Sequence, residues 1–424
     1  MRIRYFFITI ILLLLPVFSW AEIITASTCS LTDVTNAYNA AMSGDTVIIP
    51  AGECSWSSRL TLSKAITLQG QGTSTKIINN YNSNGLIYIS PSADLAIRVT
   101  RIYFYNATNN PGYTTILING KKDGSLPLSK VRIDNNKIEM GTRCIDPEGW
   151  ITGVIDSNQF VNCNIAIAGY GDGNYAWNRP IEAGTKDFLF IEDNLFTVNN
   201  STPREPNEQI YHNSDGAKTV VRYNTFDYSS YTNGNAMPWE AHGNWGSIST
   251  YPSVRGTPIM EFYNNTITAY RSYRFMSHRG GSLLMHNNTF SQTSGSPASI
   301  DLKEEESWPN STIFNMTPPV DTAWPAWDQV TNTFIWDNTV NGSPMIPYCY
   351  SSYDAVFIQQ NRDYFLHAPQ SSGGKSTYPT IPGKNDMTFS ASGPNAYYPY
   401  TPFTYPHPLR GEEGINPPAG FKKL

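Results

Sequence analysis

The sequence predicts an all-β solenoid, in which short coils of three strands stack along one axis. Three observations predict it: an asparagine motif that recurs along the chain, many short apolar tracts bounded by turn residues, and a composition rich in glycine, proline and tyrosine. Charged residues make up only 15% of the chain and aromatic residues 13%, which suits strands and turns better than helices.

The recurring motif is an asparagine, then any residue, then a β-branched or aromatic residue. It begins at Asn136, Asn158, Asn194, Asn224, Asn265, Asn288 and Asn338. These asparagines are 22, 36, 30, 41, 23 and 50 residues apart, so a short period is interrupted by insertions. We expect each asparagine to lie at a bend that tolerates left-handed backbone and to bond the equivalent asparagine one coil away. The apolar residue two positions later should enter the core.

Strand-like tracts are spread along the chain. They are β-branched or aromatic runs bounded by Gly, Asn, Asp or Ser, at 75–78, 85–89, 101–104, 188–191 and 219–223. Near the start, Ser30 can cap a helix whose apolar positions from Val34 to Ala41 follow the 3.6-residue period and which Gly44 ends. Such a helix would cover the open end of the solenoid, with a first strand at 46–49.

The asparagine repeat resembles the right-handed parallel β-helix of the pectin lyase-like superfamily, over roughly residues 29–345. The run from Asp33 to Trp56 is similar to the N-terminal cap of secreted bacterial β-helix proteins, and residues 405–409 are similar to their tail. The resemblance implies architecture more than chemistry, because the superfamily includes lyases, hydrolases, esterases and non-catalytic adhesins.

The first 21 residues predict a secretory signal. Arg2 and Arg4 precede an apolar stretch, and Ser19-Trp20-Ala21 offers a small-residue cleavage site, so the mature protein should begin near Glu22 and be extracellular or periplasmic. No later stretch approaches the ~20 apolar residues of a membrane helix. The net charge of −5 gives no sign of a nucleic-acid partner.

Export favours disulfides, and Cys29 and Cys54 are the expected pair. Cys144 and Cys163 follow their own motif asparagines by 8 and 5 residues, so they are out of register and a bond between them is disfavoured, and Cys349 is left over. Residues 22–345 should form the β-helix with its cap. Residues 346–424, rich in proline and tyrosine, should form an extension on its outside, because proline cannot donate to a central ladder.

Candidate site residues lie in the coils with the longest insertions. Three short strands there end in glycine, and aligning these glycines stacks Asp215, His242 and Arg279, with Glu240 on the same face as His242. A register shifted by one residue would present His212 and His278 instead. Expected substrate contacts are His212, Arg274, His278, Tyr273, Trp239 and Trp245.

This set favours a lyase acting on an acidic glycan. β-Elimination from a uronate needs a base and a cation, which His242 and Arg279 could supply, with Asp215 or Glu240 orienting the imidazole. A glycoside hydrolase would use Asp215 and Glu240 as its two carboxylates, and a non-catalytic glycan-binding β-helix would use the row as paired charges. An esterase lacks a nucleophile motif, and the motif strings of polygalacturonases are absent.

The sequence indicates no definite cofactor. Calcium is a candidate, because Glu304, Glu305 and Glu306 are adjacent carboxylates, although a run of charges is more often a solvated loop. The expected partner is a polysaccharide. Neither the particular glycan nor the oligomeric state follows from the sequence.

Overall fold

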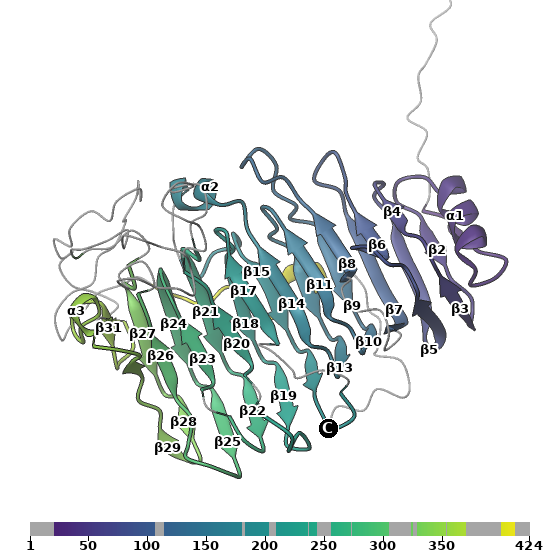
Figure 1. Ribbon diagram of the computed structural model, residues 1–424. Helices are drawn as coiled ribbons and strands as arrows, with labels where there is room; N and C mark the ends of the chain where they lie inside the picture. The colour runs from purple at the N-terminus through teal and green to yellow at the C-terminus, as the bar shows by residue number, and fades with distance from the viewer. Residues whose placement is uncertain are drawn as a thin grey trace, which may run out of the picture.

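Figure 1 shows the computed structural model, an elongated stack of coils with α1 (Leu31–Ala40) at its N-terminal end. The structure describes residues 21–106, 114–179, 183–202, 209–235, 237–243, 256–272, 274–304, 324, 329–352, 354–369 and 400–411, with the backbone alone for 211–214. The described strands pair in parallel from coil to coil, apart from one antiparallel pair at the C-terminal end, so the fold is a parallel β-helix. This confirms the predicted fold class.

The coils present three faces. Face 1 is a separate sheet whose described strands are β4 (Leu60–Leu62), β6 (Ile87–Ile89), β8 (Thr114–Asn119), β11 (Arg143–Glu148), β14 (Ile165–Tyr170), β17 (Ile210–Ser214), β20 (Trp239–Ala241), β23 (Met276–His278), β26 (Ile300–Leu302) and β30 (Tyr348–Cys349).

Faces 2 and 3 are joined at the N-terminal end by two long strands, β5 (Thr67–Asn79) and β7 (Ile97–Asn106), whose first parts pair on face 2 and last parts on face 3. The other strands of face 2 are β1 (Ile23–Thr25), β2 (Thr46–Ile48), β9 (Val131–Asp134), β12 (Val154–Asp156), β15 (Leu189–Glu192), β18 (Thr219–Arg222), β21 (Ile259–Tyr263), β24 (Ser282–His286), β27 (Thr333–Trp336) and β31 (Tyr364–Phe365). The other strands of face 3 are β3 (Gly52–Trp56), β10 (Lys137–Glu139), β13 (Gln159–Val161), β16 (Leu195–Thr197), β19 (Thr225–Tyr228), β22 (Thr266–Ala269), β25 (Thr289–Gln292), β28 (Thr339–Val340) and β29 (Ser343–Pro344).

The motif asparagines form a buried ladder at the bend between faces 2 and 3. Asn194 Nδ2 donates to Asn224 Oδ1 at 3.0 Å, and the same oxygen accepts the backbone N–H of Asn194 at 2.9 Å. The pattern runs from Asn136 to Asn338, which confirms the predicted contact between equivalent asparagines. The left-handed residue, however, is the one before each asparagine, as at Asp193 (φ 56°), and not the asparagine itself.

The apolar residue two positions after each ladder asparagine is buried, as predicted. On three successive coils these residues are Phe160, Phe196 and Phe226, whose rings stack at 4.9 and 4.5 Å between centroids. Stacked identical side chains are what a fixed coil register produces. The motif therefore sets both the bend and one column of the core.

The N-terminal cap follows its sequence signals closely. Ser30 accepts a hydrogen bond from the Asp33 N–H at 3.2 Å, and Val34 and Tyr38 are buried, although the helix ends at Ala40 before Gly44. Cys29 and Cys54 form a disulfide, with their Cα atoms 5.8 Å apart.

Cys144 and Cys163 also form a disulfide, with Cα atoms 6.6 Å apart, so the expectation against this bond is wrong. The bond joins neighbouring coils diagonally, because Arg143 is the register partner of Ile165, two residues after Cys163. A disulfide needs only Cα atoms within about 7 Å and does not require equal register. Cys349 carries no disulfide among the described residues.

The coil stack continues beyond residue 345. Tyr348–Cys349 pairs with β26 on face 1, and Tyr364–Phe365 pairs with β27 on face 2. The expected boundary at 345 is therefore too early, because short strands among turn residues leave little periodic signal in the sequence. Two short helices, α2 (Asn174–Asn178) and α3 (Asp354–Phe357), lie outside the sheets, and no helix in the described ranges is long and apolar enough to cross a membrane.

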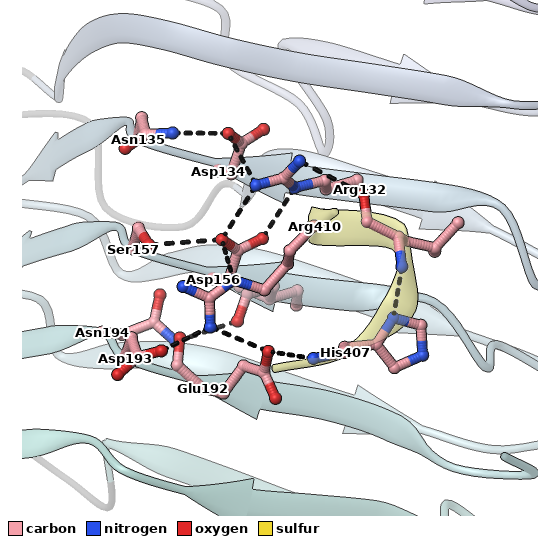
Figure 2. Close-up of polar contacts among 12 residues, drawn as sticks. Arg132, Asp134, Asn135, Asp156, Ser157, Glu192, Asp193, Asn194, His407 and Arg410 are labelled. Carbon is pink, nitrogen blue, oxygen red and sulfur yellow. Dashed lines mark hydrogen bonds and ion pairs between the residues drawn. The ribbon is translucent and has the colours of Figure 1, made fainter. Parts of the chain in front are cut away.

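Residues 400–411, called the C-terminal segment here, pack across the outer side of face 2 and end in the 3-10 helix η3 (Pro408–Arg410). Figure 2 shows Arg410 reaching across two strands, where it pairs with Asp156 at 3.1 Å, with Glu192 at 2.8 Å and with Asp193. The His407 N–H donates to Glu192 at 2.9 Å. The segment is thus fixed by buried or half-buried charges that point away from the core.

Farther along the segment, Arg222 of β18 donates to the carbonyls of Phe403 and Thr404 at 2.6 and 2.8 Å. Tyr400 donates to Glu261 of β21 at 2.8 Å. Phe403, Leu409 and Tyr400 also pack against an apolar cluster on the outer side of face 2. The C-terminal segment therefore covers several consecutive coils of face 2.

Candidate functional site

Face 1 carries two outer rows of side chains, which alternate with the core along each strand. In β20, Trp239 and Ala241 belong to the core and Glu240 points outward, while its register partners are Ser277 in β23 and then Asp301 in β26. The second row follows two residues later. Extending the pair of Ala241 and His278 by one residue aligns His242 with Arg279, as glycine alignment predicted.

The charges of three consecutive coils form one cluster on this face. We call it the charged cluster: contacts join Glu240, Arg274, Arg279 and Asp301, and extending the strand register places His242 and Lys303 in the second row beside them. Arg279 Nη1 lies 2.5 Å from Glu240 Oε1, and Arg274 lies 3.8 Å from the same oxygen and 2.9 Å from Asp301 Oδ2. Glu240 therefore contacts the two arginines, a different role from the expected orientation of the imidazole.

His242 is 1% exposed, and its Nδ1 lies 3.3 Å from the carbonyl oxygen of Gly243. Because a carbonyl only accepts, Nδ1 donates in this contact, and in the neutral ring Nε2 would then carry the lone pair. That tautomer is the one suited to accept a proton from a substrate. Lys303, on the next coil after Arg279, lies with its ammonium 4.0 Å from the ring centre of Tyr350.

Asp215 does not join this row. It follows β17 in a left-handed turn with φ 54°, and the pairing of β14 with β17 shifts register between Ala168 and Tyr170. Continuing the pair of Ile210 and Trp239 aligns residue 211 with Glu240, so Asp215 lies beyond the level of His242. The predicted stack of three is therefore correct for two residues and wrong for Asp215. β17 carries a bulge of one residue, which glycine alignment cannot reveal and which accounts for part of the offset.

Asp215 instead lines a cleft of about 550 Å³ at the end of β14 and β17. Its other lining residues are Lys122, Gly171, Asp172, Gly173, Asn174, Tyr175 and Asn178. Burial raises the pKa of Asp215, Lys122 lowers it and Glu148 raises it again. Backbone contacts link the turn after Asp215 to the turn after His242, since Gly216 donates to the carbonyl of Gly256, which packs directly on the backbone of Gly243.

Two expected substrate contacts face the core. Trp239 is fully buried, with its ring 4.6 Å from that of Phe262, and His278 is fully buried, with Nε2 3.3 Å from Thr333 Oγ1. Burial lowers the pKa of His278 to about 3, so its ring is neutral. Both assignments are wrong for a substrate on the outer face, because alternation that directs Glu240 outward directs its neighbours inward.

Three other predicted contacts cannot be compared with the structure. Tyr273 and Trp245 lie outside the described residues, and so does the side chain of His212. Their roles stay predictions. Arg274 lies in the charged cluster, through its contacts with Glu240 and Asp301.

Sequence reasoning missed several polar residues of face 1. Asp301 and Lys303 extend the two rows by one coil, and Asp146 occupies the first row on β11. Tyr170, an aromatic residue that the sequence did suggest for sugar contact, lies in the second row on β14. Burial raises the pKa of Asp146, and although Arg143 lowers it in part, the net pKa is about 6. Burial also raises the pKa of Tyr170 to about 12. These residues could be found only by counting one and three positions along each face 1 strand from its first inward residue. That count needs the register of the strands, which the insertions hide.

Within the described residues, no group of three or more His, Cys, Asp or Glu side chains is placed to hold a metal ion. Glu304 is buried, and its Oε2 accepts a hydrogen bond from the Val330 N–H at 2.9 Å. Glu305 and Glu306 lie outside the described residues, so calcium binding at this run stays a prediction.

Comparison with known proteins gives likenesses of fold. No protein-family model matches the chain, and no curated protein matches it by sequence. An alginate lyase from Paenibacillus sp. strain FPU-7 aligns with a TM-score of 0.48 and 11% identity, over 78% of this chain and 99% of that one. The catalytic domain of a GH87 α-1,3-glucanase variant in complex with nigerose aligns with a TM-score of 0.32 and 13% identity, over 81% of this chain and 67% of that one.

Proposed function

We propose that this chain is a secreted polysaccharide-active protein and that it cleaves a uronate-containing glycan by β-elimination at the charged cluster. One observation carries the proposal: the outer side of face 1 combines an imidazole with three cationic side chains and two carboxylates on adjacent coils. Adjacent coils are ~4.8 Å apart, so these groups can act on one glycosidic linkage. The excess of cations suits a substrate that carries carboxylates.

The chemistry assigns a role to each type of group. A base removes the proton on the carbon α to the uronate carboxylate, the electron pair forms a double bond to the next ring carbon, and the bond from that carbon to the glycosidic oxygen breaks. His242 Nε2 accepts the proton and can return it to the leaving oxygen. Arg279, Arg274 and Lys303 stabilise the negative charge that develops on the carboxylate.

Glu240 and Asp301 position the arginines. Each carboxylate contacts at least one guanidinium, which fixes the donor geometry before substrate arrives. The same contacts favour a second function, a glycan-binding β-helix without catalysis, because paired charges of this kind also occur as purely structural contacts. Measuring products separates the two.

Secretion is part of the proposal. The two disulfides, Cys29–Cys54 and Cys144–Cys163, form and persist in an oxidising compartment, which supports export by the predicted signal. Expression of the full sequence with export should yield a chain whose first residue, by mass spectrometry, is near Glu22. Retention of the first 21 residues would contradict it.

The decisive experiment incubates the exported protein with alginate, pectate and glycosaminoglycans and follows both unsaturated uronate absorbance and new reducing ends. We expect unsaturated products, and His242→Ala should lower kcat by about 10² to 10⁴. His367→Ala, a histidine outside face 1, serves as the matched control. Unsaturated products at an undiminished rate from His242→Ala would refute the assigned base, and reducing ends without unsaturation would indicate a hydrolase.

Access to the charged cluster can be measured separately. Glu240, His242 and Arg279 are 3%, 1% and 7% exposed, so a reacting glycan must reach groups that are closed to bulk water in this structure. We expect a histidine-acylating reagent to modify His242 slowly, and a bound glycan to suppress this modification, with each site assigned by mass spectrometry. Glycan-independent modification of His242 would place the substrate elsewhere.

A further inference from the structure

The cleft lined by Asp215 is rigidly built. A Cβ on Gly171 would lie 2.2 Å from the backbone of Gly216 and Ala217, and one on Gly216 would lie 2.4 Å from the carbonyl oxygen of Gly173. The Gly173 N–H also donates to the carbonyl of Asp215 at 2.5 Å. The two loops that form the cleft thus touch backbone to backbone, which preorganises its floor.

Tyr175 forms one wall of the cleft and is 49% exposed. Its ring is held in place, since a Cβ on Gly124 would be 3.0 Å from Tyr175 Cβ, Cγ and Cδ1. An aromatic ring fixed against backbone while half its surface meets solvent is suited to stack on the flat apolar side of a sugar ring.

The polar groups of the cleft suit hydroxyl groups. Asn174 Oδ1 is buried and has no hydrogen-bond partner among the described residues, and Asp215 supplies a further acceptor. The volume of about 550 Å³ falls within the ~300–1,000 Å³ range of small-ligand sites.

The charges of the cleft are opposite in balance to those of the charged cluster. In and beside the cleft, Asp172, Asp215 and Glu148 face two cations, with Arg179 held by Asp172 at 2.6 Å and Lys122 by Glu148 at 2.8 Å. In the charged cluster three cations face two carboxylates. A sugar carboxylate is therefore favoured over the cluster and opposed in the cleft.

We infer that the cleft is a subsite for an uncharged sugar, so that the substrate is a heteropolysaccharide in which uronates alternate with neutral units. This inference rests on the proposed function, because it places the uronate over the charged cluster. The cleft lies next to the turn that contacts Gly256 and Gly243, so one chain can occupy both places. A homopolymer of uronates would bring a carboxylate toward Asp215.

The test compares two tetrasaccharide probes, one alternating uronate with N-acetylhexosamine and one made of uronate alone. Calorimetric binding to His242→Ala, which holds substrate without turnover, should favour the alternating probe. Asp215→Asn should tighten the all-uronate probe about tenfold relative to the alternating one, because a like-charge contact is removed. Tyr175→Ala should weaken the alternating probe about fivefold.

Asp337→Asn, an exposed residue on a distant bend, is the matched control and should leave both affinities unchanged. Equal or better binding of the all-uronate probe, with no response to Asp215→Asn, would overturn the subsite while leaving β-elimination intact. Absence of any cleavage by the unsubstituted protein would instead remove the proposed reaction. Thermal unfolding of each variant shows whether it has kept its fold.

Discussion

Replacing Asn224 with alanine tests whether the asparagine ladder holds the coils together. Asn224 is 1% exposed, and its Nδ2 donates to Ile191 O, Arg222 O and Asn265 Oδ1 at 2.9 to 3.0 Å. Its Oδ1 accepts both the backbone and the side-chain N–H of Asn194. Alanine leaves two or three of these buried groups without a partner, at about 1–3 kcal/mol each, so we expect a loss of about 3–5 kcal/mol in the free energy of unfolding.

Urea unfolding followed by tryptophan fluorescence and circular dichroism measures this loss. Asn80→Ala, at an exposed position outside the ladder, is the control and should change stability by less than about 0.5 kcal/mol. Asn224→Asp keeps an acceptor for Asn194 but turns a carboxylate toward two carbonyls, so its deficit should shrink as the pH falls and the carboxyl is protonated. If Asn224→Ala unfolds like the control, the ladder is not what secures the bend.

Three further predictions concern other parts of the molecule. Arg410→Ala should release the C-terminal segment, which would appear as faster amide hydrogen exchange in residues 400–411. Arg410→Lys should restore protection only in part, because an ammonium cannot contact two carboxylates as the planar guanidinium does. Unchanged exchange would contradict this prediction. Burial raises the pKa of Glu261 to about 7, so between pH 4.5 and 7 the folded chain holds a proton that the unfolded chain lacks. The contribution of this proton to the free energy of unfolding is complete at low pH and is lost as pH rises through 7. As the pH rises from 5 to 8, the free energy of unfolding of Glu261→Gln should therefore increase by roughly 3 kcal/mol relative to that of the unsubstituted protein. A difference that does not change with pH would refute this prediction. Replacing both Cys144 and Cys163 with serine should lower stability by about 3 kcal/mol, checked by urea unfolding of the two proteins.

The sequence was sufficient for the parts of the fold that repeat. Asn194, Asn224 and Asn265 occupy equivalent places on successive coils, so a local motif reports directly on long-range contacts. The capping helix was equally predictable, because Ser30 is a favourable N-cap residue and the buried positions Val34 and Tyr38 follow the helical period. In each case the information lies within a few residues.

The site was less predictable, because it depends on register across insertions of unequal length. His242 and Arg279 were aligned correctly by the glycines that follow them, whereas Asp215 lies beyond their level, after a strand whose register with β14 shifts between Ala168 and Tyr170. The disulfide between Cys144 and Cys163 was missed for a related reason. The expectation required the two cysteines to be in register, whereas the bond is diagonal. Bulges and diagonals are set by packing between coils and leave no mark in the sequence of either strand.

The C-terminal segment has a consequence for the order in which the chain assembles. Arg132 and Leu409 meet across 277 positions, and Arg222 and Phe403 across 181, so these contacts can form only after all the intervening coils have been synthesised. Until then the aromatic and acidic residues on the outer side of face 2 face water, with Phe190 among them. A chain interrupted before residue 400 would leave this aromatic surface of face 2 exposed to water. We expect such a chain to self-associate even though every coil is present.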